Sequence, residues 1–138
     1  MINYRAFIVG VKTTRLTQKE KKFLKKYKPW GVILFTRNIK NIKQTRELTT
    51  SIRKIFGNNK YPILIDQEGG RVNRLKSLIS FDNLTSEFFG KKFINKPKEF
   101  NSFYKLFIDK TSELLKLIGV NINTSPVLDL RVKGSSNI

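Results

Sequence analysis

The chain has 138 residues, of which 28 are Lys or Arg and 10 are Asp or Glu, so its formal net charge is +18. It contains no Cys and no His, which excludes disulfide bonds, thiolate metal sites, cysteine nucleophiles and histidine general acids or bases. Hydrophobic residues make up 39% of the chain, too many for a disordered tail, and the length predicts one domain. Its chemistry must therefore use carboxylates, Lys, Arg, hydroxyl groups or the backbone.

The first apolar run, residues 6–11, ends at Lys12. A signal-peptide core needs roughly 7–15 apolar residues and a cleavage site, and a membrane helix needs about 20. We therefore expect a cytoplasmic chain that makes no contact with a membrane.

Four apolar segments predict strands, and the uninterrupted runs among them are typical of strands buried on both faces: residues 6–11, 31–35, 62–66 and 120–124. Helical spacing and end signals predict the intervening helices: residues 17–28, 43–56, 86–93 and 97–118. Thr17 and Glu20 fit a capping box at the first helix, and Pro29 ends it. Pro97 suits the first turn of the last helix.

The helices carry apolar stripes. In the second helix the stripe has the spacing of one helical face: Leu48, Ile52, Ile55 and Phe56. In the last helix the apolar face is longer: Phe100, Phe103, Tyr104, Phe107, Ile108, Leu114, Leu115 and Ile118. Repeated strand–helix units with apolar strands predict an α/β fold with parallel strands.

Two architectures fit this repetition, the doubly wound sheet and the (β/α)8 barrel. Both place functional sites at the carboxyl ends of their strands. A complete barrel needs about 250 residues, so four βα units amount to half of one.

Acidic residues follow the predicted strands. Asp66 and Glu68 come at the end of the third strand, and Asp129 follows the fourth. Asp66 has Arg71 and Arg74 near it in sequence, so a functional carboxylate and a structural ion-pair network are equal alternatives for it. For Glu68 and Asp129 the structural role is favoured. The adjacent pair Gly69-Gly70 predicts a tight turn with positive φ. A phosphate cradle is a weak alternative, because the segment lacks a complete phosphate-binding glycine pattern.

Three segments carry a family resemblance: residues 33–38 (ILFTRN), 65–74 (IDQEGGRVNR) and 125–129 (SPVLD). Together they resemble glycoside hydrolase family 3, and within it the single-domain bacterial β-N-acetylhexosaminidases of peptidoglycan recycling. The resemblance implies an incomplete (β/α)8 TIM barrel of about four βα units. It also implies that residues 1–138 form the N-terminal half of such a barrel domain, with no metal or organic cofactor.

The resemblance further implies roles for individual residues. The residue at Asp66 is similar to one that accepts hydrogen bonds from sugar hydroxyls where a terminal N-acetylglucosamine binds, and Arg74 is similar to its basic companion. Supporting roles in the loops are implied for four others: Arg37, Glu68, Arg71 and Asp129. The expected partner is a small carbohydrate that contains N-acetylglucosamine.

The sequence departs from the family at the catalytic groups. The family's acid/base is a His after the fifth strand and its nucleophile is an Asp after the seventh, whereas this chain has no His and ends at Ile138. A retaining glycosidase needs both groups, so no catalytic residue is assigned. We expect the 138-residue chain alone to be poorly stable and to release no chromophore from a chromogenic N-acetylglucosaminide. Turnover that Asp66→Ala abolishes would contradict this expectation.

Three alternatives remain open. A dense basic cluster could form a non-catalytic nucleic-acid-binding module, but a solvated helix face is favoured and nucleic acid is not the expected partner. The cluster consists of Lys19, Lys21, Lys22, Lys25, Lys26 and Lys28. The chain could instead resemble the β-glucosidases of family 3. It could also pair with a second copy or a separate chain to rebuild a barrel.

Overall fold

The computed structural model describes residues 3–126. Four parallel strands form one sheet: β1 (Arg5–Gly10), β2 (Pro29–Leu34), β3 (Ile63–Ile65) and β4 (Ile122–Asn123). Their order in the sheet, β1-β2-β3-β4, is their order in the chain. The predicted α/β class with parallel strands is therefore confirmed.

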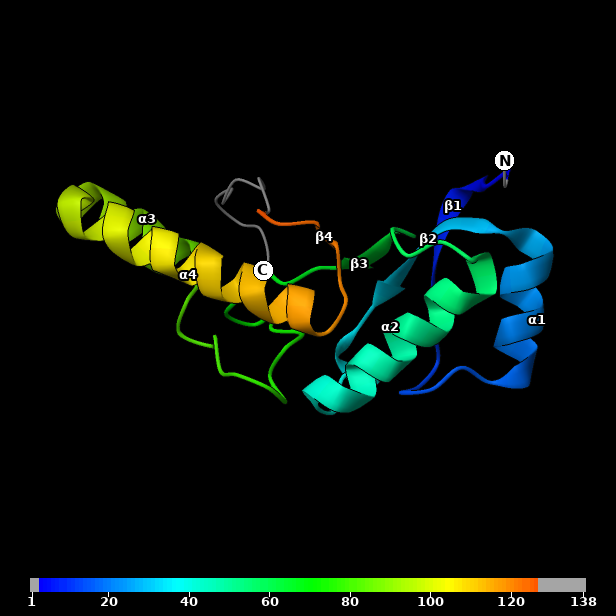
Figure 1. The fold of residues 1–138 in the computed structure, drawn as a ribbon. Coiled ribbons are helices and arrows are strands. Elements are labelled where there is room, and N and C mark those ends of the chain that lie inside the picture. The colour runs from blue at the N-terminus through cyan, green and yellow to red at the C-terminus, as the bar shows by residue number, and fades with distance from the viewer. Residues whose placement is uncertain (1–2, 127–138) are drawn as a thin grey trace, which may run out of the picture.

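The helices lie where the sequence predicts them, with small shifts at their ends: α1 (Gln18–Tyr27), α2 (Ile42–Phe56), α3 (Ser86–Asn95) and α4 (Pro97–Leu117). The capping box of α1 is formed, because Thr17 Oγ1 accepts from the Glu20 amide at 3.2 Å and Glu20 Oε2 accepts from the Thr17 amide at 2.7 Å. Pro97 occupies the first turn of α4. Figure 1 shows α1 and α2 next to each other beside the sheet, whereas α3 and α4 form a hairpin that extends away from it.

The core lies between α2 and the central strands. The predicted stripe of α2 is confirmed, since Leu48, Ile52 and Phe56 are buried and Ile55 packs against them. All three residues of β3 are buried. Burial of this kind provides most of the stability of a small domain, at roughly 1.5–3 kcal/mol for each large apolar side chain.

The prediction that the first strand is buried on both faces is wrong. Residues of β1 are exposed or only half-buried, and Ile8 is 44% exposed. The reason is position, because β1 lies at the edge of the described sheet and pairs only with β2. An apolar run therefore indicated a strand here without indicating how many neighbours cover it.

The apolar face of α4 is covered only in part. Leu115 and Ile118 are buried, whereas Phe103 and Ile108 are 36% and 45% exposed. The aromatic residues nearer the start of α4 pack mainly on α3, as in the contact of Phe89 with Phe107, where the ring centroids are 5.0 Å apart. The hairpin thus has an aromatic cluster that joins the main core through Phe107, whose ring lies 5.3 Å from that of the core residue Phe81.

Candidate functional site

The register of the sheet brings three strand ends to one level. Leu34 of β2 pairs with Ile65 of β3, and Ile65 pairs with Asn123 of β4. The residues that follow these three are therefore neighbours at the carboxyl edge: Phe35, Asp66 and Thr124. Paired residues of parallel strands project to the same side of a sheet, so the three side chains share one face.

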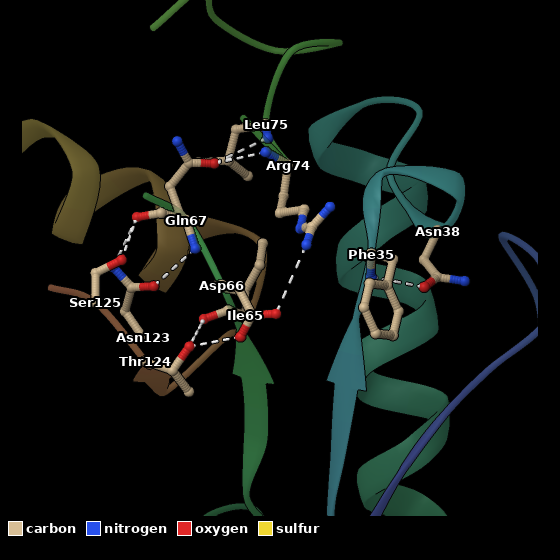
Figure 2. Close-up of polar contacts among 10 residues, drawn as sticks. All are labelled: Phe35, Asn38, Ile65, Asp66, Gln67, Arg74, Leu75, Asn123, Thr124 and Ser125. Carbon is tan, nitrogen blue, oxygen red and sulfur yellow. Dashed lines mark hydrogen bonds and ion pairs between the residues drawn. The ribbon is translucent and has the colours of Figure 1, made fainter. Parts of the chain in front are cut away.

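Asp66 is held from two sides, as Figure 2 shows. Its Oδ1 accepts a hydrogen bond of 2.5 Å from the Thr124 hydroxyl, and its Oδ2 lies 3.7 Å from Arg74 Nη2. The side chains of Asp66 and Arg74 keep 29% and 28% of their surface exposed. The carboxylate is thus oriented by protein groups while part of it stays accessible to a solute.

Arg74 is positioned by its surroundings. Its guanidinium carbon lies 5.4 Å from the centre of the Phe35 ring, and Arg37 lies over the same ring at 4.5 Å. The backbone amide of Arg74 donates to Gln67 Oε1 at 2.9 Å. The cation–π contacts and this hydrogen bond hold the guanidinium near Asp66.

Gln67 links the segment after β3 to the residues at the end of β4. Gln67 is 2% exposed. Its backbone N–H donates to Asn123 Oδ1 at 3.0 Å. Its backbone carbonyl accepts from Asn123 Nδ2 at 3.3 Å and from the Ser125 hydroxyl at 2.7 Å. Its own Oε1 also accepts from the Leu75 amide. These bonds to Gln67 Oε1 and to the side chain of Asn123 tie the segments after β3 and β4 together, whereas the buried Gln67 Nε2 has no hydrogen-bond partner among the described residues.

The Gly69-Gly70 turn is confirmed. Both residues have positive φ, 90° and 56°, and the Gly70 amide donates to the Phe81 carbonyl at 2.9 Å. The segment after the turn folds back over it, so a side chain at Gly69 would collide with the Leu84 carbonyl. The turn therefore belongs to the packing that holds the Asp66–Arg74 segment in place.

The other predicted site residues lie around this centre. Arg37 donates from Nε to the Val11 carbonyl at 3.2 Å, which ties the loop after β2 to the segment after β1. Glu68 is half-buried and its backbone amide donates to Val72, whereas Arg71 is exposed. Asp129 lies outside the described residues. The structure thus brings Asp66 and Arg74 together and places Arg37 next to them.

A hollow of about 410 Å³ lies beside the site. Its polar wall includes Gln67, Glu68 and Asn123, and its apolar wall comes from the aromatic residues of α3 and α4, among them Phe89 and Phe107. Asp66 is not in its wall, so the hollow does not contain the Asp66 carboxylate. Within residues 3–126 no group of three or more His, Cys, Asp or Glu side chains could hold a metal ion.

Three neighbours in this part of the structure were not singled out by the sequence: Gln67, Asn123 and Thr124. Thr124 meets Asp66 across 58 positions of sequence. The available signal was the polar Asn-Thr-Ser run of residues 123–125 directly after the fourth predicted strand.

The chain is similar to known proteins. The family model described as "Glycosyl hydrolase family 3 N terminal domain" matches residues 5–137. Curated beta-hexosaminidases are similar to the chain: that of Xanthomonas euvesicatoria pv. vesicatoria is 30% identical over 126 residues, and that of Haemophilus influenzae is 32% identical over 127. The alignments cover 89% and 91% of this chain but 36% and 34% of those relatives, so the chain spans about a third of their length.

Solved structures are similar to the chain as well. NagZ from Neisseria gonorrhoeae in complex with zinc ion superposes with a TM-score of 0.75 at 28% identity, over 94% of this chain and 38% of that one. NagZ in complex with N-trifluoroacetyl-D-glucosamine superposes with a TM-score of 0.72 at the same identity. These similarities do not favour the nucleic-acid and β-glucosidase alternatives. The chain belongs to glycosyl hydrolase family 3, and its residues 5–137 match the N-terminal domain of that family.

Proposed function

We propose that this chain supplies the part of a β-N-acetylhexosaminidase-type site that binds a terminal N-acetylglucosamine. The observation that carries the proposal is the partly exposed Asp66 carboxylate, held by Thr124 and Arg74 at the carboxyl edge of the sheet. The hexosaminidase names of the relatives and the N-acylglucosamine analogue bound by NagZ support this choice of sugar.

The carboxylate has room for sugar hydroxyls. An ionised carboxylate offers about four acceptor positions. The Thr124 hydroxyl uses one position on Oδ1, and Arg74 at 3.7 Å from Oδ2 makes an ion pair rather than a hydrogen bond, so each oxygen keeps at least one position for a ligand. Charge-assisted hydrogen bonds to two hydroxyls would orient the ring, and Arg74 would keep the carboxylate turned toward it. Arg37, Glu68, Arg71 and Asp129 would support the surrounding loops.

We also propose that the four βα units are successive units of an incomplete (β/α)8 barrel, and that residues 1–138 are the N-terminal half of that domain. The strand order supports this arrangement, because every strand pairs with the one before it in the chain. A doubly wound sheet reverses its order at a switch point, and the described sheet has no reversal. Hydrolysis would be completed by groups outside the Asp66 cluster, since a retaining mechanism needs a nucleophile and an acid/base.

The proposed setting is peptidoglycan recycling in the cytoplasm. The relatives are bacterial beta-hexosaminidases, and the family resemblance joins this branch to that process. None of the helices in the described part of the chain has both the length and the apolar character needed to span a membrane.

Binding of N-acetylglucosamine tests the proposed site. We expect Asp66→Asn to weaken binding at least about tenfold, because the amide keeps the size of the side chain but replaces one charged acceptor with a donor. Titration of the 138-residue chain with N-acetylglucosamine, followed by NMR chemical-shift changes, measures the effect. Glucose serves as the competitor that reports on the N-acetyl group.

Asp109→Asn is the matched control. It makes the same chemical change at an exposed carboxylate on α4 that pairs with Lys105 at 2.7 Å. Its affinity for the sugar should equal that of the unaltered chain. Equal binding by the Asp66→Asn chain would overturn the proposal.

A further inference from the structure

A second hollow lies at the opposite, amino-terminal edge of the sheet. It measures about 310 Å³ and is lined by α2, by the last turn of α4, by the turn before β3 and by the residues just before β4. Four of its lining residues are basic: Arg46, Arg53, Lys60 and Lys116. No Asp or Glu belongs to its lining among the described residues. Four cations around one hollow with no carboxylate among them create a positive local potential, which attracts anions whatever the net charge of the chain.

Helix α2 contributes both arginines that line this hollow, Arg46 and Arg53. They are seven positions apart, about two helical turns, so they lie on the same face of the helix. Arg46 Nη1 donates to the Leu117 carbonyl at the end of α4 at 2.8 Å, which fixes that guanidinium. Arg53 Nε is buried and has no hydrogen-bond partner among residues 3–126. The arrangement therefore holds one anchored guanidinium and one with an unused donor.

Gly119 makes space for Arg53. Its φ is +80°, and a Cβ there would collide with Thr49 Oγ1 and lie 3.1 Å from Arg53 Nη1. The hydroxyl of Thr49 in turn donates to the Ile118 carbonyl at 2.9 Å. The backbone before β4 thus approaches α2 closely, with the Arg53 guanidinium beside the glycine at the wall of the hollow.

Burial and a neighbouring positive charge both destabilise the charged form of Arg53. Burial, followed by the positive charge of Arg46, lowers the pKa of the Arg53 guanidinium from its ordinary value. A buried donor without an acceptor also costs stability. An anion in the hollow would offset the repulsion between the two guanidinium groups, because its negative charge lies close to both.

We propose that this hollow binds the dianionic phosphate group of a free phosphate or a phosphate monoester. Guanidinium forks match the tetrahedral oxygens of phosphate with paired hydrogen bonds, while Lys60 and Lys116 add compact charges. The site lies at the other edge of the sheet from Asp66 and does not depend on the proposed sugar site.

The test is a titration of the 138-residue chain at constant ionic strength, followed by ³¹P NMR, with inorganic phosphate in one arm and phenyl phosphate in the other. We expect saturable binding in at least one arm. Tighter binding of phenyl phosphate would assign the site to monoesters, and equal or tighter binding of inorganic phosphate would assign it to the free ion. Acetate at the same concentration should not compete, because it carries one charge.

Two variants and one control locate the binding. Arg53→Gln and Lys60→Gln should each weaken binding about tenfold or more, and Lys60 lies in an exposed turn where the change leaves the core intact. Lys25→Gln removes the same charge from the exposed face of α1 and should change the affinity less than twofold. Absence of saturable binding, or an equal loss in the Lys25→Gln chain, would overturn the proposal.

Discussion

Replacing Gly69 by alanine is expected to lower the free energy of unfolding by about 3 kcal/mol or more, from backbone strain together with overpacking. Gly69 has a φ of +90°, a conformation that L side chains rarely adopt, and its Cβ would collide with the backbone carbonyl of Leu84. A backbone atom cannot rotate away as a side chain can, so the segment after the turn would have to move. Urea denaturation followed by circular dichroism measures the loss.

Two other glycines separate strain from collision. Gly57 also has positive φ, +58°, at the end of α2, but a Cβ there meets nothing within 4 Å. Gly57→Ala should therefore cost only about 1 kcal/mol, from strain alone. Gly90 lies inside α3 with open space around it, so Gly90→Ala should stabilise by about 0.5–1 kcal/mol. A Gly69→Ala chain as stable as the Gly57→Ala chain would contradict the proposed collision.

Replacing Asn38 by aspartate should lower the free energy of unfolding by about 3 kcal/mol, although the two side chains have the same shape. Asn38 is fully buried, and its Nδ2 donates to the carbonyls of Val11 at 3.0 Å and Thr13 at 2.8 Å. Its Oδ1 accepts from the Phe35 amide at 2.9 Å. An aspartate keeps the last bond but directs an oxygen at two carbonyl oxygens in a buried place, at a cost of roughly 1–3 kcal/mol for each unsatisfied group.

The same change on an exposed residue is the control. Asn101 lies exposed on α4, so Asn101→Asp should change the unfolding free energy by less than about 0.5 kcal/mol. Thermal denaturation of both variants at neutral pH compares them. If the Asn38→Asp chain is as stable as the Asn101→Asp chain, the buried hydrogen bonds of Asn38 contribute little.

Local signals explain which parts of the fold were predictable. The capping box of Thr17 and Glu20 and the proline at the start of α4 depend on neighbours within one helical turn, and both are formed. The burial of β1 depends on how many strands and helices lie beside it, which the run of residues 6–11 does not encode. The same holds for α4, whose apolar face contains Phe103 and Ile108 in exposed positions.

In the candidate site, too, contacts between residues close in sequence were predictable and contacts between distant segments were not. Asp66 and Arg74 are eight positions apart at one strand end, so their proximity could be predicted from the sequence. The partnership of Asp66 with Thr124, and that of Gln67 with Asn123, join loops 58 and 56 positions apart. Their geometry follows from the pairing of β3 with β4, and that register is not visible in either segment alone.

The order of the strands has a consequence for how the chain reaches this structure during synthesis. Each strand pairs with the one that left the ribosome just before it, and no strand waits for a later one to be inserted between them. Successive βα units can therefore dock one at a time on a surface that already exists. Assembly in this order keeps each newly made apolar segment exposed for only a short time.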